Sequence, residues 1–338
     1  MKYSLVELAP VSPGGSKHDA LVTALDAARE AEELGYHRIW YAEHHDTPGY
    51  ASQDPVALIA VAARETTRIR VGSGAVLLNH YSSFSVAERF LQLEALAPGR
   101  IDLGLGRATA GPLVDAALRR DRQAQPVDDF ASQVKEVLAH MHGTFAADHP
   151  FATFDLTAGI DSLPEVWLLG SSGNSADLAG NLALGYAFAG FINPDAAVRA
   201  LGTHRDSFQA PPDGAGRRGA ILALNMVAAD DAETAHRLTW PARHLRQKLL
   251  TGEPATTSTV AEAEAALTPV MKALPSSFDG VTIPRQLAGT AATLRSQLEQ
   301  LVQLTGATEI MVQDMLVDPE RRTRSRELIA EAVAAIAP

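Results

Sequence analysis

Residues 37–45 read HRIWYAEHH, a short run of β-type residues that ends in two adjacent histidines. Its central Ile-Trp-Tyr is typical of a buried strand, and a helical pattern ends just before it at Leu34-Gly35. In parallel α/β proteins, ligands bind at the carboxyl ends of the strands. His44 and His45 are therefore placed for proton transfer, anion contact or metal ligation. The structural alternative is a histidine pair hydrogen-bonded into the strand–loop junction.

The same alternation of strand and helix continues along the whole chain. Strands are predicted at residues 3–8, 37–42, 69–76, 101–105, 165–169, 186–189, 220–227 and 309–313. Helices are predicted at residues 18–34, 54–66, 84–97, 127–142, 175–184, 194–208, 290–305 and 319–336. This alternation of strands and helices indicates an α/β fold of the (β/α)₈ TIM-barrel type with insertions.

A doubly wound dinucleotide-binding sheet is the competing arrangement, and it requires a Gly-x-Gly-x-x-Gly turn after its first strand. Residues 10–16 do not supply that turn. The nearest match, Gly104-Leu105-Gly106, has Thr109 where the third glycine belongs. We therefore do not expect a nicotinamide-binding Rossmann domain.

Length and composition set the limits of function. A chain of 338 residues, 46% of them hydrophobic, is predicted to form one barrel domain over residues 1–338. The absence of cysteine excludes disulfides, thiolate metal sites and a cysteine nucleophile. A net charge of −11 argues against nucleic-acid binding as the main activity. The sequence has no membrane-length apolar run and no signal-peptide pattern, so a cytoplasmic protein is expected.

One stretch, residues 240–285, interrupts the alternation. It carries five prolines, and only a piece around residues 260–267 has a helical pattern. Insertions of this length between barrel elements are usually functional lids or disordered segments. Because the preceding strand delivers the chain to the carboxyl ends of the barrel, we predict a lid there. Trp240 opens this segment and is a candidate for lining a substrate pocket.

Two other sets of polar side chains are not expected to form part of a functional site. His140 and His142 are two positions apart on one predicted helix, so they do not share a face, and no metal site is expected. The arginines of the last predicted helix are interpreted as a solvated face, or as a surface that contacts a partner; they are Arg321, Arg322, Arg324 and Arg326. Trp40 and Trp167 lie in predicted strands and are expected in the core.

Small and polar residues follow four successive strands. The second predicted strand ends in Glu43-His44-His45. The third predicted strand is interrupted by Gly72 and Gly74, which is typical of a bulge or of close approach by a ligand. The fourth ends at Arg107. The fifth runs through Gly170-Ser171-Ser172-Gly173 into a helix, where hydroxyls and free N–H groups favour a phosphate. An ordinary Ser/Asn helix cap is the alternative for this last segment.

Taken together, these motifs resemble the bacterial luciferase-like flavin monooxygenase family. The similar segments are AEHH at residues 42–45, VGSGAVLLNH at 71–80, PGRIDLGLGR at 98–107, GSSG at 170–173, LAPV at 8–11 and LAGTAATLRSQL at 287–298. They occur in the family's order on the expected elements. The resemblance covers nearly the whole chain and is weakest at residues 123–161 and 240–285.

The resemblance implies a barrel that holds reduced FMN, supplied by a separate flavin reductase, which reacts with O₂ to give a flavin hydroperoxide that oxygenates a small organic substrate. His44 matches the family's active-site histidine, with His45 and Glu43 as orienting or lining neighbours. A homodimer is the family expectation.

The resemblance also assigns the cofactor site. A non-proline cis peptide beneath the flavin ring would here be Gly74–Ala75. Asn79 and Arg107 match positions near the ring or the phosphate. The residues that match the phosphate loop are Ser171, Ser172, Gly173 and Ser175.

Some residues depart from the light-emitting luciferases. No cysteine lies near Arg107, and Ser171 stands where their α subunit has a glutamate. These differences put aldehyde oxidation and light emission in doubt and leave FMN binding intact. Hydride transfer with the deazaflavin F420 is the alternative activity. A non-catalytic flavin-binding protein is the third hypothesis, and a metal-dependent barrel hydrolase is a distant fourth.

Overall fold

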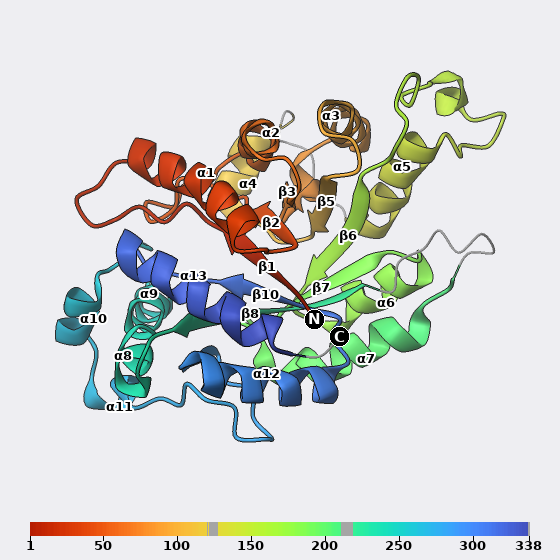
Figure 1. Ribbon diagram of the computed structural model, residues 1–338. Coiled ribbons are helices and arrows are strands. Elements are labelled where there is room, and N and C mark those ends of the chain that lie inside the picture. The colour runs from red at the N-terminus through yellow and green to blue at the C-terminus, as the bar shows by residue number, and fades with distance from the viewer. Residues whose placement is uncertain (120, 122–127, 211–218, 337–338) are drawn as a thin grey trace.

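The computed structural model describes residues 1–119, 121, 128–210 and 219–336. Parallel strands close into a barrel, because β1 pairs with β2 on one edge and with β10 on the other, and β10 also pairs with β8. Helices surround the strands (Figure 1). The predicted (β/α)₈ barrel is confirmed.

The elements follow the predicted order. The strands are β1 (Lys2–Glu7), β2 (Arg38–Tyr41), β3 (Arg70–Ser73), β4 (Val76–Leu77), β5 (Ile101–Gly106), β6 (Glu165–Gly170), β7 (Gly185–Ala189), β8 (Ala220–Ala228), β9 (Gln286–Gly289) and β10 (Glu309–Gln313). The α-helices are α1 (Lys17–Glu33), α2 (Pro55–Glu65), α3 (Ser83–Leu96), α4 (Pro112–Leu118), α5 (Phe130–His142), α6 (Gly173–Asn181), α7 (Ala197–Ser207), α8 (Ala232–Arg237), α9 (Trp240–Thr251), α10 (Val260–Ala266), α11 (Pro269–Lys272), α12 (Ala291–Thr305) and α13 (Pro319–Ala334). Short 3₁₀ helices are η1 (Leu78–His80), η2 (Pro150–Thr153) and η3 (Pro194–Ala196).

The structure differs from the prediction at two strands and at the start of one helix, and it adds α4, α8 and α9, which the sequence did not suggest. The third predicted strand is divided into β3 and β4. The short strand β9, which the sequence did not suggest, pairs with the end of β8, and its Ala and Gly have little strand propensity. The helix predicted from residue 127 begins at Phe130, and Val127 lies outside the described residues.

Local signals explain where the first helices begin and which face they bury. Ser16 caps α1 in a reciprocal capping box with Asp19, and Asp54 caps α2 ahead of Pro55. The inner face of α1 consists of buried alanines. Their small side chains let the helix lie close to the strands.

The interior of the barrel is a separate apolar cluster. Trp40 and Trp167 meet edge to face there, with ring centroids 5.6 Å apart. Both side chains are almost fully buried, at 0% and 2% exposure, so their predicted place in the core is confirmed. Val6, Ile221 and Met311 belong to the same cluster.

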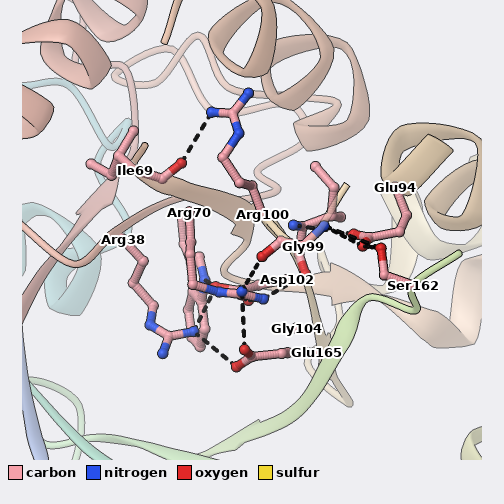
Figure 2. Close-up of polar contacts among 12 residues, drawn as sticks. Arg38, Ile69, Arg70, Glu94, Gly99, Arg100, Asp102, Gly104, Ser162 and Glu165 are labelled. Atoms are coloured by element: carbon pink, nitrogen blue, oxygen red, sulfur yellow. Dashed lines mark hydrogen bonds and ion pairs between the residues drawn. The ribbon is translucent and has the colours of Figure 1, made fainter. Parts of the chain in front are cut away.

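A layer of buried charges lies at the amino end of the barrel, in contact with these two indoles. Figure 2 shows four of its members, Arg38, Arg70, Asp102 and Glu165. Arg38 donates to Asp102 at 2.6 Å and to Glu309 at 2.9 Å. Arg70 binds the other oxygen of Asp102 at 2.6 Å and Glu165 at 3.0 Å. Burial alone would raise the pKa of Asp102, but Arg38 and Arg70 outweigh it and hold the pKa below its usual value.

The arginines of α13 are a second departure from expectation. Arg321 and Arg324 are exposed, but Arg322 and Arg326 are buried. Both buried guanidinium groups bind Glu7 of β1, at 2.9 and 3.1 Å, and both bind Asp314. The interpretation of this helix face as solvated was therefore wrong for two of its four arginines. These two attach α13 to the barrel wall.

No helix in the described parts of the chain combines the length and apolarity needed to cross a membrane.

The charge layer makes a stability prediction. Asp102→Ala leaves Arg38 and Arg70 without their shared buried carboxylate, so the free energy of unfolding should fall by about 3–5 kcal/mol. Asp26→Ala, which removes a carboxylate paired with Arg29 at the surface, should change it by less than about 0.5 kcal/mol. Urea unfolding followed by circular dichroism measures both. Similar changes in the two variants would contradict a structural role for the layer.

Candidate active site

The residues proposed from the sequence lie along one arc of the barrel rim. His44 and His45 follow β2, Gly74 and Ala75 lie between β3 and β4, and Asn79 lies in η1. Arg107 follows β5, and the serines from Ser171 to Ser175 follow β6 into α6. Strands β2, β3, β5 and β6 are adjacent in the sheet. The fold therefore brings all of these segments to the carboxyl end of the barrel, side by side.

His44 is half-buried, and its backbone N–H is hydrogen-bonded while its ring Nδ1 is not. Its backbone N–H donates to the Ser52 carbonyl at 2.9 Å, and its ring lies 4.8 Å from that of Tyr50. Its Nδ1 is buried with no hydrogen-bond partner among the described residues. Burial, with a small contribution from His45, lowers the pKa of His44 to about 4. The ring is therefore neutral at pH 7 and has a free polar atom at the rim.

Glu43 ties three segments together beside His44. One carboxylate oxygen lies 2.7 Å from Nε2 of His45 and accepts the hydroxyl of Tyr81 at 3.0 Å. The other oxygen accepts the N–H of Leu77 in β4 at 3.0 Å. The Glu43 side chain is completely buried. This carboxylate fixes both the His45 ring and the start of η1 in relation to the His44 loop.

Glycines let the strands next to this loop approach each other closely. A Cβ at Gly104 would collide with the carbonyl of Ser73, whose hydroxyl and Gly104 backbone exchange hydrogen bonds of 2.9 Å. A Cβ at Gly106 would lie 3.0 Å from that of Ala75. The Gly74–Ala75 peptide bond is cis, as the family resemblance implied.

Asn79 and Arg107 lie together at the next position on the rim. The Asn79 amide donates to the Arg107 carbonyl at 3.1 Å. The Arg107 side chain is half exposed, and its nearest acidic atom, on Asp128, is 3.8 Å away. The guanidinium is therefore held loosely enough to meet an anion.

The start of α6 has the features of an anion site. Ser172 is the N-cap residue, yet its hydroxyl makes no capping hydrogen bond. The Ser172 carbonyl accepts the Tyr186 hydroxyl at 2.9 Å, and the Ser171 carbonyl accepts the Asn193 amide at 3.0 Å. Ser175 lies against Gly170 so closely that a Cβ there would collide with its hydroxyl. The loop is thus fixed by its carbonyls, while its hydroxyl at the cap is left for a ligand.

Gly173 begins this helix beside open space. A Cβ built at Gly173 meets no heavy atom within 4 Å. The glycine is therefore not required by packing within the described protein. A group outside the protein can approach its backbone closely.

Residues 240–285, called the lid below, contain α9, α10 and α11. Leu245 and Ala242 of α9 join the interior cluster together with Leu8, Tyr50 and Met315. This contact places α9 at the mouth of the barrel, whereas the role of the segment as a lid stays a prediction.

Trp240 does not line a pocket at the mouth. It is 8% exposed and packs with Ala263 and Leu267 of the lid itself. The expectation for Trp240 was therefore wrong, because the indole joins α9 to α10.

Four residues near the site carried no signal in the sequence. The Tyr50 ring lies against His44, Tyr81 binds Glu43, and Tyr186 and Asn193 hold the α6 loop. Tyr50 shares a loop with His44, but the other three lie in different segments from their partners, so no local pattern connects them. The described residues contain no cluster of acidic and histidine side chains that could hold a metal ion.

Comparison with known proteins identifies the class. The family model described as luciferase-like monooxygenase matches residues 1–309. The uncharacterized protein YwcH of Bacillus subtilis is 36% identical over 99% of both chains, and the N-acetyl-S-alkylcysteine monooxygenase of the same organism is 31% identical over 99% of both. The crystal structure of apo-MsnO8 superposes with a TM-score of 0.89 at 36% identity, covering 100% of this chain and 99% of the other.

The chain belongs to the luciferase-like monooxygenase family. It is accordingly an enzyme of the oxidoreductase class, and the barrel rim described above is its candidate active site.

The lowered pKa of His44 predicts that the free energy of unfolding depends on pH. The unfolded chain takes up a proton on this ring near pH 6.5, while the folded protein resists it down to about pH 4. The free energy of unfolding should therefore fall as the pH drops from 6.5 to 4, by up to about 1.4 kcal/mol per pH unit from this group.

His44→Phe should remove that part of the slope, while His37, whose pKa burial also lowers to about 4, keeps its own part. Urea unfolding at several pH values measures the slope, and ¹H NMR of the imidazole gives the pKa directly. A titration midpoint near 6.5 for His44 in the folded protein would refute the burial argument.

Glu43 should protect the Leu77 amide. Glu43→Ala leaves that N–H and the His45 ring without their acceptor, at a cost of about 1–3 kcal/mol for each unsatisfied group. Amide exchange at Leu77, followed by NMR, should become faster than the global loss of stability explains. Glu65→Ala, which removes a partly exposed carboxylate paired with Arg29, serves as the control. Unchanged exchange at Leu77 would show that Glu43 does not hold β4.

Proposed function

We propose that this protein is an FMN-dependent monooxygenase of the two-component type. It takes reduced FMN from a separate flavin reductase and uses O₂ to oxygenate a small organic substrate. The observation that carries the proposal is that one rim holds both a half-buried imidazole whose buried Nδ1 has no hydrogen-bond partner among the described residues, on His44, and an uncapped helix start with open space at Gly173.

The residues present fit a flavin phosphate. The hydroxyl of Ser172 and the first N–H groups of α6 offer donors, and the helix dipole favours an anion. Ser171, Gly173 and Ser175 belong to the same loop. Arg107 would supply the positive charge from β5, and Asn79 would hold the Arg107 backbone toward the ring.

Bound reduced FMN would supply the electrons for activation of O₂, with one oxygen atom going to the substrate and the other to water. The protein would bind the ring over the segment that contains Gly74 and Ala75. His44, neutral at pH 7, would accept or hold a proton beside the ring. His45, oriented by Glu43, would be the second proton-carrying group, and the lid would exclude water.

Solved structures support both cofactor options at the level of the fold. A Type II Baeyer–Villiger monooxygenase component of Pseudomonas putida, solved in complex with FMN, has a TM-score of 0.73 at 20% identity. An F420-dependent secondary alcohol dehydrogenase has a TM-score of 0.66 at 13% identity. We favour FMN because relatives that cover nearly the whole chain are named monooxygenases. Parallel anaerobic titrations with reduced FMN and reduced F420 separate the two.

We further propose that the enzyme acts in the cytoplasm as a homodimer.

A relative with 31% identity is an N-acetyl-S-alkylcysteine monooxygenase, so an N-acetyl-S-alkylcysteine is the first substrate to test. Oxygenated product would also exclude a non-catalytic flavin-binding role.

His44→Ala should separate chemistry from cofactor binding. We expect nearly normal affinity for reduced FMN and turnover lowered by about 10²–10⁴-fold, the usual contribution of a positioned acid or base. Anaerobic flavin titration and product analysis under O₂ measure the two effects. Unchanged turnover would remove His44 from the mechanism.

Replacements at the proposed phosphate site should have the opposite effect. Gly173→Leu meets no protein atom near the backbone, so it should fold normally and occupy the ligand's space. Arg107→Ala removes a half-exposed cation. Both should weaken reduced FMN binding by about tenfold or more, whereas Arg295→Ala, an exposed arginine of α12, should not. Normal titration curves for Gly173→Leu and Arg107→Ala would overturn the phosphate assignment.

A further inference from the structure

A pocket of about 430 Å³ lies at the seam between the lid and the loops that follow β1 and β2. We call it the seam pocket. Its volume is in the range of small-molecule sites. His44 does not line it, so it is distinct from the candidate active site. Its main lining residues are Val11, Pro13, Pro48, His244, Lys248 and Ser258.

The seam is closed by direct contact between the lid and the loop that carries His44. A Cβ at Gly49 would collide with the carbonyl of Ala255, so only glycine permits this approach. The Thr257 hydroxyl donates to the carbonyl of Val11, whose own N–H donates to Gly49 at 2.9 Å. Whatever occupies the pocket therefore touches the lid and both loops at once.

The charge in the seam pocket comes from α9. Lys248 donates to the carbonyl and hydroxyl of Thr256 at 3.1 and 2.9 Å, and to the Ser258 hydroxyl at 3.3 Å. Ser258 is bonded more closely to Nδ1 of His244, at 2.8 Å. No acidic side chain forms an ion pair with Lys248 within the described ranges. The ammonium thus donates hydrogen bonds only to neutral acceptors, of which the Ser258 hydroxyl is the most distant, and it also interacts electrostatically with the Glu262 carboxylate.

One carboxylate also lines the pocket. Glu262 accepts the N–H and hydroxyl of Thr259 at 2.8 and 3.0 Å in the capping box of α10. These bonds orient its charge toward the helix start. The loops that follow β1 and β2 contribute the apolar side chains of Val11, Pro13 and Pro48 to the lining, together with Ser12 and three glycines.

We propose that the seam pocket binds a small organic carboxylate. Its anionic group takes the place of Ser258 at Lys248, exchanging a neutral acceptor for a charged one. Its apolar part lies against Val11, Pro13 and Pro48. Because the ligand contacts both sides of the seam, its binding favours the closed position of the lid over the His44 loop.

The test needs no flavin, so its result is independent of the proposed oxygenation. Flavin-free protein is titrated with butyrate, with the neutral isostere butyramide and with inorganic phosphate, and binding is followed by NMR. We expect saturable binding of butyrate, with at least tenfold weaker binding of the other two. Equal binding of butyramide would overturn the role of charge, and equal or tighter binding of phosphate would overturn the carboxylate assignment.

Lys248→Met keeps the length of the side chain and removes its charge, and it should weaken butyrate binding by roughly tenfold. Lys135→Met, at an exposed position of α5, is the matched control and should change nothing. Gly49→Ala, which forces the seam apart while retaining Lys248, should also weaken binding. Undiminished affinity in Lys248→Met would overturn the proposal, as would undiminished affinity in Gly49→Ala.

Discussion

The shared carboxylate of Asp102 is the constraint on which the barrel depends. It binds Arg38 from β2, Arg70 from β3 and the indole N–H of Trp40, all within 2.9 Å. Arg38 extends the layer to Glu309 of β10 and Arg70 extends it to Glu165 of β6. Buried ion pairs often add little net stability, but removing one partner is costly. The layer therefore acts mainly on register, because a strand that slipped by one residue would leave a charge unpaired.

The register of the strands, set at their amino ends, determines where the residues at their carboxyl ends lie. The strands that carry the buried charges also deliver His44, Arg107 and the α6 loop to the rim. The residues that stabilise the barrel thus lie at its amino end and the candidate active-site residues at its carboxyl end, as is usual in this fold. At the rim, Glu43 has a role similar to that of Asp102, because its single buried carboxylate holds three segments together. The unbonded polar atoms near it, such as Nδ1 of His44, remain for a ligand.

The parts of the fold that were predictable from the sequence have local signals. The strands and helices follow from periodicity, and Asp54-Pro55 marks the start of α2. The cis bond at Gly74–Ala75 was predictable only through the family resemblance. The partners of Arg322 and Arg326 were not predictable, since Glu7 lies 315 and 319 residues away from them and a helical arginine run looks the same whether buried or exposed. The contact between Gly49 and Ala255 at the seam was not predictable either, because the two residues are far apart in the sequence.

The central claim is that the arc of rim from β2 to β6 binds reduced FMN. Hydrogen exchange, measured by mass spectrometry under anaerobic conditions with and without reduced FMN, tests it most directly. We predict slower exchange on binding in two segments, residues 43–45 and residues 170–176, with little change at the amino end of the barrel. Binding of reduced FMN without protection of either segment, or no binding at all, would contradict the account.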